Sequence, residues 1–195
     1  MIFEYLPFVT TMYATHVHLF PGEGVSVILT LSILFLTSYL MHIVSHAAWY
    51  TTFAEKYNPD FIFHKMVHHD PTTGGDARNL FHECVQNFFS TSLLWFPPTF
   101  LVLHVPSCIS FGFIYASYHL LNQGILAPRA HELHHQDTSY NYGYDFMDVL
   151  FDTKHPLDET YEDLTSGVLN ILVAATLVKL MTCATTGIGT PRSSS

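Results

Sequence analysis

The chain has 195 residues, of which 49% are hydrophobic and only 12% are charged. The charged share is about half of that in an ordinary soluble domain, and the apolar content excludes a disordered chain. Sixteen acidic against seven basic residues argue against a nucleic-acid partner. The chain also contains fourteen histidines, which are largely neutral at pH 7 and therefore available as metal ligands.

The first part of the chain predicts one membrane-spanning helix. Residues 1–20 are aromatic and apolar but interrupted by Pro7, so we expect an interfacial or partly inserted segment there. Residues 25–40 carry no charge, and their helical continuation to Tyr50 makes roughly 26 residues, or about 39 Å. That length crosses a bilayer with a turn or more to spare.

Two further apolar stretches follow. Residues 84–96 meet Pro97 and Pro98, and the apolar run resumes over residues 99–118. Proline cannot continue an unbroken helical ladder, so this pattern predicts a helical hairpin whose first limb begins near Asn79. Residues 164–181 form the last candidate helix, interrupted only by Ser166, Asn170 and Lys179.

The basic residues predict the orientation of these helices. Five of them fall in the two polar stretches that join the apolar runs: Lys56, Lys65, Arg78, Arg129 and Lys154. The positive-inside rule therefore places both polar stretches in the cytosol. A soluble all-α protein with buried helices is the alternative interpretation, but a small domain has little room to bury three long uncharged runs.

The expected architecture is an all-α integral membrane helical bundle with a cytosol-facing, histidine-rich site for two metal ions. We expect one membrane domain over residues 1–195. It comprises an N-terminal interfacial segment (1–24), a histidine-rich core (25–153), a linker with a C-terminal apolar helix (154–182) and a tail (183–195).

Most histidines fall in three clusters beside the predicted cytosolic stretches. The clusters are His42 with His46, His64 with His68 and His69, and His131 with His134 and His135; His119 ends the returning limb of the hairpin. Residues at i, i+3 and i+4 share a helix face, so each cluster presents two or three imidazoles to one centre. Nine imidazoles exceed the four ligands of a tetrahedral zinc site and predict two metal ions. His16, His18 and His104 lie apart and are expected not to bind metal.

These clusters resemble the histidine boxes of the fatty acid hydroxylase and sterol desaturase superfamily, which are membrane di-iron oxygenases. The resemblance rests on HIVSH at 42–46, HKMVHH at 64–69 and HELHH at 131–135. It extends to Pro128 before the last box, NYG at 141–143 and DVLFDT at 148–153, and covers residues 40–153. The middle box has one extra residue in its first gap, and Asp152 replaces the usual glycine.

The resemblance also implies residues that support the metal ligands. Ligand histidines need an acceptor for their other ring N–H, which carboxylates, amides and hydroxyls supply. The expected supporting residues are His82, Glu83, Asn122, Gln123, Asn141, Tyr142 and Asp148. Gln123 stands where the fatty acid 2-hydroxylase branch has a second histidine after His119, whereas Asn122 fits the His-x-x-Asn pattern of other branches.

The resemblance implies O₂-dependent hydroxylation or desaturation of a lipid by two iron ions. It also implies a separate electron donor, such as cytochrome b5 and its reductase, because no haem segment or dinucleotide-binding glycine motif is visible. The expected location is the membrane, and the endoplasmic reticulum if the source is eukaryotic. The alternatives left open are a histidine-rich metal transporter and an inactive member of the superfamily.

Overall fold

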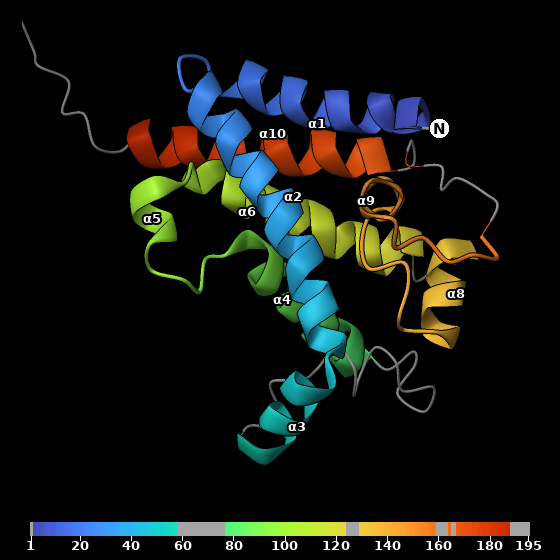
Figure 1. Ribbon diagram of the computed structural model, residues 1–195. Coiled ribbons are helices and arrows are strands. Elements are labelled where there is room, and N and C mark those ends of the chain that lie inside the picture. The colour runs from blue at the N-terminus through green and yellow to red at the C-terminus, as the bar shows by residue number, and fades with distance from the viewer. Residues whose placement is uncertain (1, 58–76, 124–128, 159–163, 165–166, 188–195) are drawn as a thin grey trace, which may run out of the picture.

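The computed structural model describes residues 2–57, 77–123, 129–158, 164 and 167–187, and all regular structure within these ranges is helical. The longest elements are α2 (Gly24–His46) and α10 (Gly167–Gly187) (Figure 1). Both are long and apolar enough to cross a membrane. The predicted all-α class is therefore confirmed for the described part of the chain, and two of the predicted stretches form helices of sufficient length. α10 continues past residue 182 into the predicted tail.

The N-terminal segment is a helix that packs on the rest of the bundle. It begins with η1 (Ile2–Tyr5) and continues as α1 (Leu6–Leu19), which lies alongside α10 and runs in the same direction (Figure 1). Pro7 occupies the first turn of α1, where its missing N–H and fixed φ are tolerated. Pro7 therefore starts this helix, which corrects the expected interruption.

α2 is apolar around its whole circumference. One side packs into the core and includes Val27, Leu31, Leu34 and Phe35. The other side is also apolar yet exposed: Val25, Leu29, Leu36 and Leu40 have exposed fractions of 43–75%. A surface helix of a soluble protein places polar residues on its outer side, whereas a helix that is apolar all round is buried or lies in lipid.

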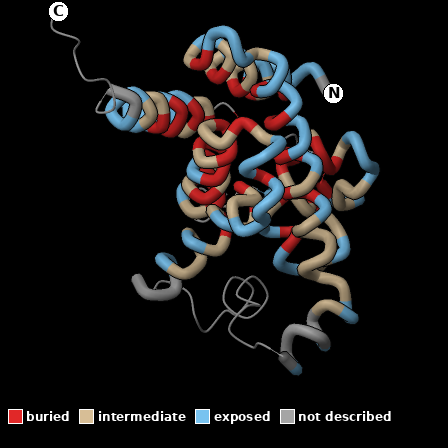
Figure 2. Tube along the Cα trace, turned by 90° about the vertical axis from the view of Figure 1, so that its left-hand side faces the viewer, coloured by how far each residue is buried: buried red, intermediate tan, exposed pale blue. Residues whose placement is uncertain are grey.

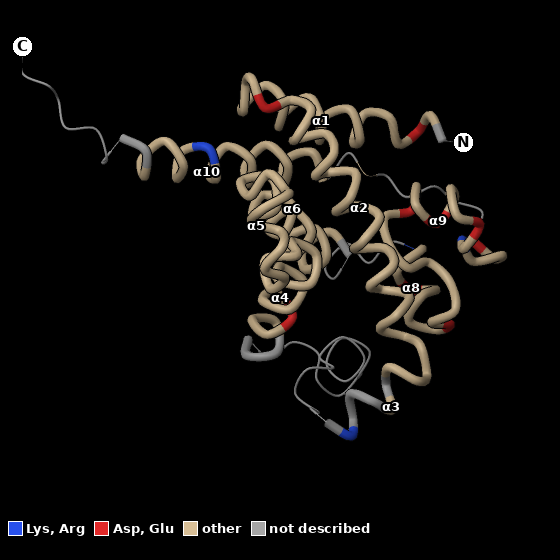
Figure 3. The backbone as a smooth tube through the Cα atoms, turned by 60° about the vertical axis from the view of Figure 1, so that its left-hand side comes forward, with Lys and Arg blue, Asp and Glu red and all other residues tan. Residues whose placement is uncertain are grey.

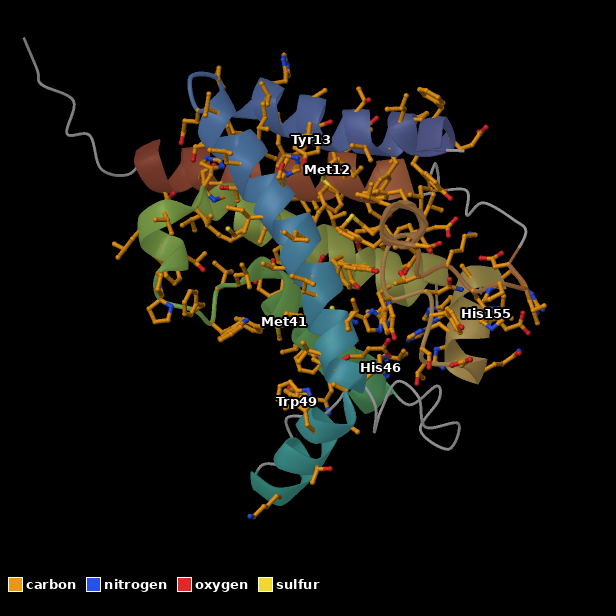
Figure 4. All side chains as sticks on the ribbon, in the orientation of Figure 1. Met12, Tyr13, Met41, His46, Trp49 and His155 are labelled. Atoms are coloured by element: carbon orange, nitrogen blue, oxygen red, sulfur yellow. The ribbon has the colours of Figure 1, made fainter. Side chains whose placement is uncertain are left out.

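The first long helix ends earlier than the sequence predicts. α2 stops at His46, Ala47 is extended with ψ 131°, and α3 (Ala48–Tyr57) begins in a new direction. The uninterrupted helix to Tyr50 is therefore wrong. The break places His46 in the last turn of α2, where Figure 4 shows it at the end of the helix with Trp49 beyond it.

The predicted hairpin is present as α4 (Ala77–Ser92) packed against α6 (Val105–Ser117), with α5 (Thr99–Val102) in the connection. The two limbs approach closely at Gly112, where a Cβ atom would lie 2.8 Å from the Phe88 ring. The first limb ends before the prolines, because Leu93 adopts a positive φ of 57°. The Thr99 hydroxyl donates to the Leu93 carbonyl at 2.8 Å and holds this turn.

Aromatic side chains join these helices in one core. Phe35 of α2 lies edge-on to Phe111 of α6 and to Tyr144, with ring centroids 5.0 and 5.7 Å apart. Figure 2 shows the buried residues on the facing sides of the helices and the exposed ones outside. The charged residues lie mainly near the ends of helices or in the loops, with α2 and α6 free of them (Figure 3).

α6 ends in η4 (Tyr118–Gln123), a π-helical turn that carries His119. Such turns often lie at functional sites. The N-terminal part of α10 holds this turn at two points. The Asn170 amide donates to Asn122 Oδ1 at 3.1 Å, and a Cβ atom at Gly167 would meet the Tyr118 ring at 3.0 Å. The amide pair joins the turn to a helix 48 residues away in the sequence.

Replacing Asn170 with leucine should lower the free energy of unfolding by about 1–3 kcal/mol, because the buried Asn122 oxygen loses its donor. Thermal unfolding in detergent measures this loss. The control Leu169→Ala changes an exposed neighbour and should stay within about 0.5 kcal/mol. A double variant Asn122→Leu/Asn170→Leu should recover part of the loss. A double variant that recovers nothing would show that the amide pair is not its cause.

Candidate metal centre

Three imidazoles meet where the last turns of α2 face α8 (Arg129–Gln136). His134 Nε2 lies 3.2 Å from His42 Nε2 and 3.2 Å from His46 Nε2. The ligand atoms of these three histidines all lie within 4.8 Å of one another. His42 and His46 are one helical turn apart with ring centroids at 5.2 Å, so the predicted pairing of these two residues is confirmed.

The backbone fixes which nitrogen of His134 carries a proton. His134 Nδ1 lies 2.6 Å from the Tyr140 carbonyl oxygen, which only accepts, so Nδ1 is the N–H and Nε2 has a lone pair. Burial lowers the pKa of His134 to about 4, against the opposing effect of the Tyr140 bond. The ring is therefore neutral at pH 7, and its lone pair points at His42 and His46.

This arrangement fits a metal ion. Two nitrogen ligands at about 2.0–2.1 Å from one metal lie roughly 2.8–3.4 Å apart at angles between octahedral and tetrahedral. The two Nε2 distances from His134 fall in this range. The backbone carbonyl on the opposite nitrogen also matches the usual support of a ligand histidine.

A second group of histidines adjoins the first. His131 Nε2 and His135 Nε2 lie 3.1 Å apart on one face of α8, and the His131 ring lies edge-on to His119 with centroids at 5.3 Å. His119 Nε2 lies 3.1 Å from Glu83 Oε1 of α4. The last box is therefore divided, because His134 joins the α2 pair while His131 and His135 face His119.

Asp148 of α9 (Asp145–Phe151) holds the loop that follows α8. Its carboxylate accepts from the backbone N–H of Tyr142 at 2.8 Å, from that of Gly143 at 3.1 Å and from the Thr153 hydroxyl at 2.8 Å. This loop contains the Tyr140 carbonyl that orients His134. Asp148 therefore acts on the centre through the loop and not by contact with a ligand ring.

Asn141 and Tyr142 complete this support. Asn141 has a positive φ of 56°, donates to the Ala130 carbonyl at 2.8 Å and accepts from the His155 N–H at 2.9 Å, which ties the loop to α8. The Tyr142 ring lies 6.0–6.2 Å from the rings of His42, His46 and His134. The expected supporting residues of the NYG segment thus lie beside the first histidine group.

The other expected site residues are placed as follows. Asn122 bonds Asn170, and His82 lies beside Phe81 on α4 with ring centroids at 6.3 Å. Gln123 closes the π-helical turn, and its side chain lies outside the described part. The predicted ligands of the middle box, His64, His68 and His69, also lie outside the described residues.

Three contributors were not predicted from the sequence. The Tyr140 carbonyl orients His134. The Tyr39 hydroxyl lies 2.5 Å from Thr153 Oγ1, and this contact joins α2 to the segment that follows α9. Asn170 holds the turn that carries His119. A lone amide in an apolar helix was the available signal for Asn170, whereas a backbone carbonyl has no sequence signature.

The fold and the site define a helical protein with two candidate membrane-spanning helices and a histidine cluster that could hold a metal ion. No family model, curated protein or solved structure matches the chain. Its function is therefore inferred from the site itself and from the spacing of the histidines.

Proposed function

We propose that the protein is a membrane-bound non-haem di-iron oxidase that uses O₂ to hydroxylate or desaturate a lipid, such as a fatty acyl chain, a sphingolipid or a sterol. The observation that carries this proposal is the neutral His134, whose Nε2 lone pair faces His42 and His46 at 3.2 Å beside a second histidine group. Two adjoining groups of imidazoles supply the nitrogen ligands that two metal ions require.

Of the described residues, His42, His46 and His134 would hold one ion, and His119, His131 and His135 the other. His64, His68 and His69 remain proposed ligands on the resemblance of the histidine boxes alone. Bound iron would supply the reduction of O₂ and the oxidation of an unactivated C–H bond. The protein positions the ligands: the Tyr140 carbonyl keeps His134 in one tautomer, and Asp148 and Asn141 hold the loop that presents this carbonyl. Imidazole suits iron, copper, nickel and zinc alike, so iron is inferred from the resemblance of the histidine boxes.

A lipid substrate is supported by the surfaces of α2 and α10. Large apolar side chains of both helices are exposed, including Leu29, Leu169, Leu177 and Leu180 at 54–65%. A soluble protein rarely exposes contiguous apolar surface on this scale, whereas a bilayer covers it. We therefore place the protein in the membrane, with the histidines at the cytosolic end of α2 as the basic residues indicate.

The position of the histidines favours an enzyme over a metal transporter. A transporter holds its ion near the middle of the bilayer, on interrupted membrane helices. His42 and His46 instead lie in the last two turns of α2, at one end of an uninterrupted helix. Electrons for O₂ reduction would come from a separate donor, such as cytochrome b5 and its reductase.

Lipid oxidation under ¹⁸O₂ tests the proposal. Membranes containing the protein, supplied with an electron donor, should form a hydroxylated lipid that carries one labelled oxygen atom. An unlabelled double bond that forms only with O₂ would assign desaturation instead. The variant His134→Ala should form neither, whereas His18→Ala, at an exposed histidine far from the site, should keep the activity. The absence of any O₂-dependent product in an unbiased lipid screen would favour a transporter or an inactive protein.

A further inference from the structure

We propose that Glu83 is itself a ligand of the second metal ion, so that the described ligands of this ion are one carboxylate together with His119, His131 and His135. The inference rests on the proposed function, because it presumes that metal ions occupy the two histidine groups. It replaces the supporting role that the sequence suggests for Glu83 with direct coordination.

The distance between Glu83 and His119 is similar to the distances between neighbouring histidines in the two groups. Neighbouring Nε2 atoms lie 3.2 Å apart in the first group and 3.1 Å apart between His131 and His135. Glu83 Oε1 lies 3.1 Å from His119 Nε2. Two ligands of one metal ion have this separation when each is about 2.1 Å from the ion.

The nitrogen that Glu83 faces distinguishes a ligand from a supporting acceptor. A carboxylate that only orients a ligand histidine bonds the ring nitrogen that does not bind metal. Nε2 is the atom that His42, His46, His131, His134 and His135 all direct into their groups. A purely orienting Glu83 would therefore make His119 the exception among six histidines, with its metal-binding atom at Nδ1.

Charge also favours coordination. The side chains of Glu83 and His119 are 13% and 3% exposed, so the carboxylate is largely removed from water. A buried carboxylate is costly unless a cation compensates it, and a divalent ion held by neutral imidazoles alone is an uncompensated buried cation. Coordination by Glu83 removes both costs at once.

The hairpin brings the two residues together. Glu83 lies in α4 and His119 follows α6, and these two limbs pack closely along their length. The Asn122–Asn170 pair then holds the π-helical turn that carries His119. The position of the carboxylate is therefore set by rigid elements, as a ligand requires.

Glu83→Gln tests the proposal in the full-length protein purified in detergent. The amide oxygen can still accept a hydrogen bond, but it is a much poorer ligand than a carboxylate. Elemental analysis should show a fall from two metal ions per chain to about one. The absorption spectrum of the Co²⁺-loaded protein should lose the bands of one site. Glu132→Gln is the matched control, because Glu132 lies among the α8 histidines but is 54% exposed and pairs with Arg129.

Glu83→His provides the second test, since it replaces the oxygen ligand by a nitrogen ligand. We expect two Co²⁺ ions per chain with one site spectrally altered. If Glu83→Gln fails to fold, the spectrum of the Co²⁺-loaded Glu83→His variant tests the proposal by itself. Altered bands support coordination by Glu83, and unaltered bands overturn it. Two ions and an unchanged spectrum in a folded Glu83→Gln variant would also overturn it. Failure of the proposed oxidase is a separate result, seen as two bound ions in the wild type without any O₂-dependent lipid product.

Discussion

Replacing His134 with alanine should remove one of the two metal ions and abolish lipid oxidation. His134 is the residue that contacts both His42 and His46, and it alone of the three is fully buried. Its loss leaves the α2 pair facing an empty space, and we expect the affinity of this site to fall by more than about 100-fold. Elemental analysis of the purified variant measures the metal content, and the ¹⁸O₂ assay measures the activity.

Two other histidines serve as controls for this result. His18 is exposed, and His104 bonds Ser107 Oγ at 2.7 Å and lies 3.3 Å from Glu23, away from α8. Alanine at either position should leave both metal ions in place, although His104→Ala should cost stability because His104 is buried. Equal metal loss in all three variants would contradict the division of the histidines into ligands and bystanders.

Replacing Asp148 with alanine should have the largest effect on stability. The Tyr142 and Gly143 N–H groups and the Thr153 hydroxyl would lose their shared acceptor. A buried donor left unpaired costs about 1–3 kcal/mol, and these three donors are half-buried, so we expect a total of about 3 kcal/mol. The loop should also release the Tyr140 carbonyl and weaken metal binding by about 10–100-fold. Thermal unfolding and metal titration of the same preparation measure the two effects.

The pH dependence of Asp148 has a definite sign. Burial raises the pKa of Asp148 to about 6, above the ordinary value of about 4 for an aspartate, against the opposing effects of its three hydrogen bonds. The folded state therefore binds more protons than the unfolded state between about pH 4 and pH 6, and this carboxyl makes stability fall as the pH rises through that window. Asp148→Asn should remove this contribution, so the stability of the wild type relative to the variant should decline from pH 4 to pH 6 and then level off.

Asp152→Asn is the matched control for both Asp148 variants. Asp152 is the C-cap residue of α9, four residues after Asp148, is exposed, and has a positive φ of 57° that asparagine tolerates. The free energy of unfolding of this variant should change by no more than about 0.5 kcal/mol. If Asp152→Asn loses as much stability as Asp148→Ala, the loss comes from removing a negative charge near α9 and not from the three hydrogen bonds of Asp148.

Several elements could be predicted because they depend on local sequence alone. The long apolar runs predict α2 and α10, since a helix that is apolar on most of its surface lies either in a protein core or in lipid. The i, i+4 spacing predicts that His42 and His46 share a face, and that His131 and His135 do so. The hairpin follows from the proline pair, although the chain turns four residues earlier, at Leu93.

The rest depends on contacts between distant segments. Periodicity cannot show that His134 contacts the α2 histidines instead of His131 and His135, because the Tyr140 carbonyl, six residues later, orients its ring. It cannot place the break at Ala47 or the π-helical turn at His119, which Asn170 holds from 48 residues away. Glu83 and Glu132 both look like acids beside histidines in the sequence, yet one is largely buried against His119 and the other is exposed beside Arg129.

The sequence by itself determined that the chain is helical, that its longest helices are apolar on every side, and which histidines are paired along a helix. These properties follow from residue spacing, because a helix repeats every ~3.6 residues wherever it lies. Only the tertiary structure decided how the paired histidines are shared between two groups and which carboxylate joins them. Those outcomes depend on how α4 and α6 pack against each other and against α2, and on how α10 contacts η4, because a rotation of any one of these helices would redirect its side chains to other partners.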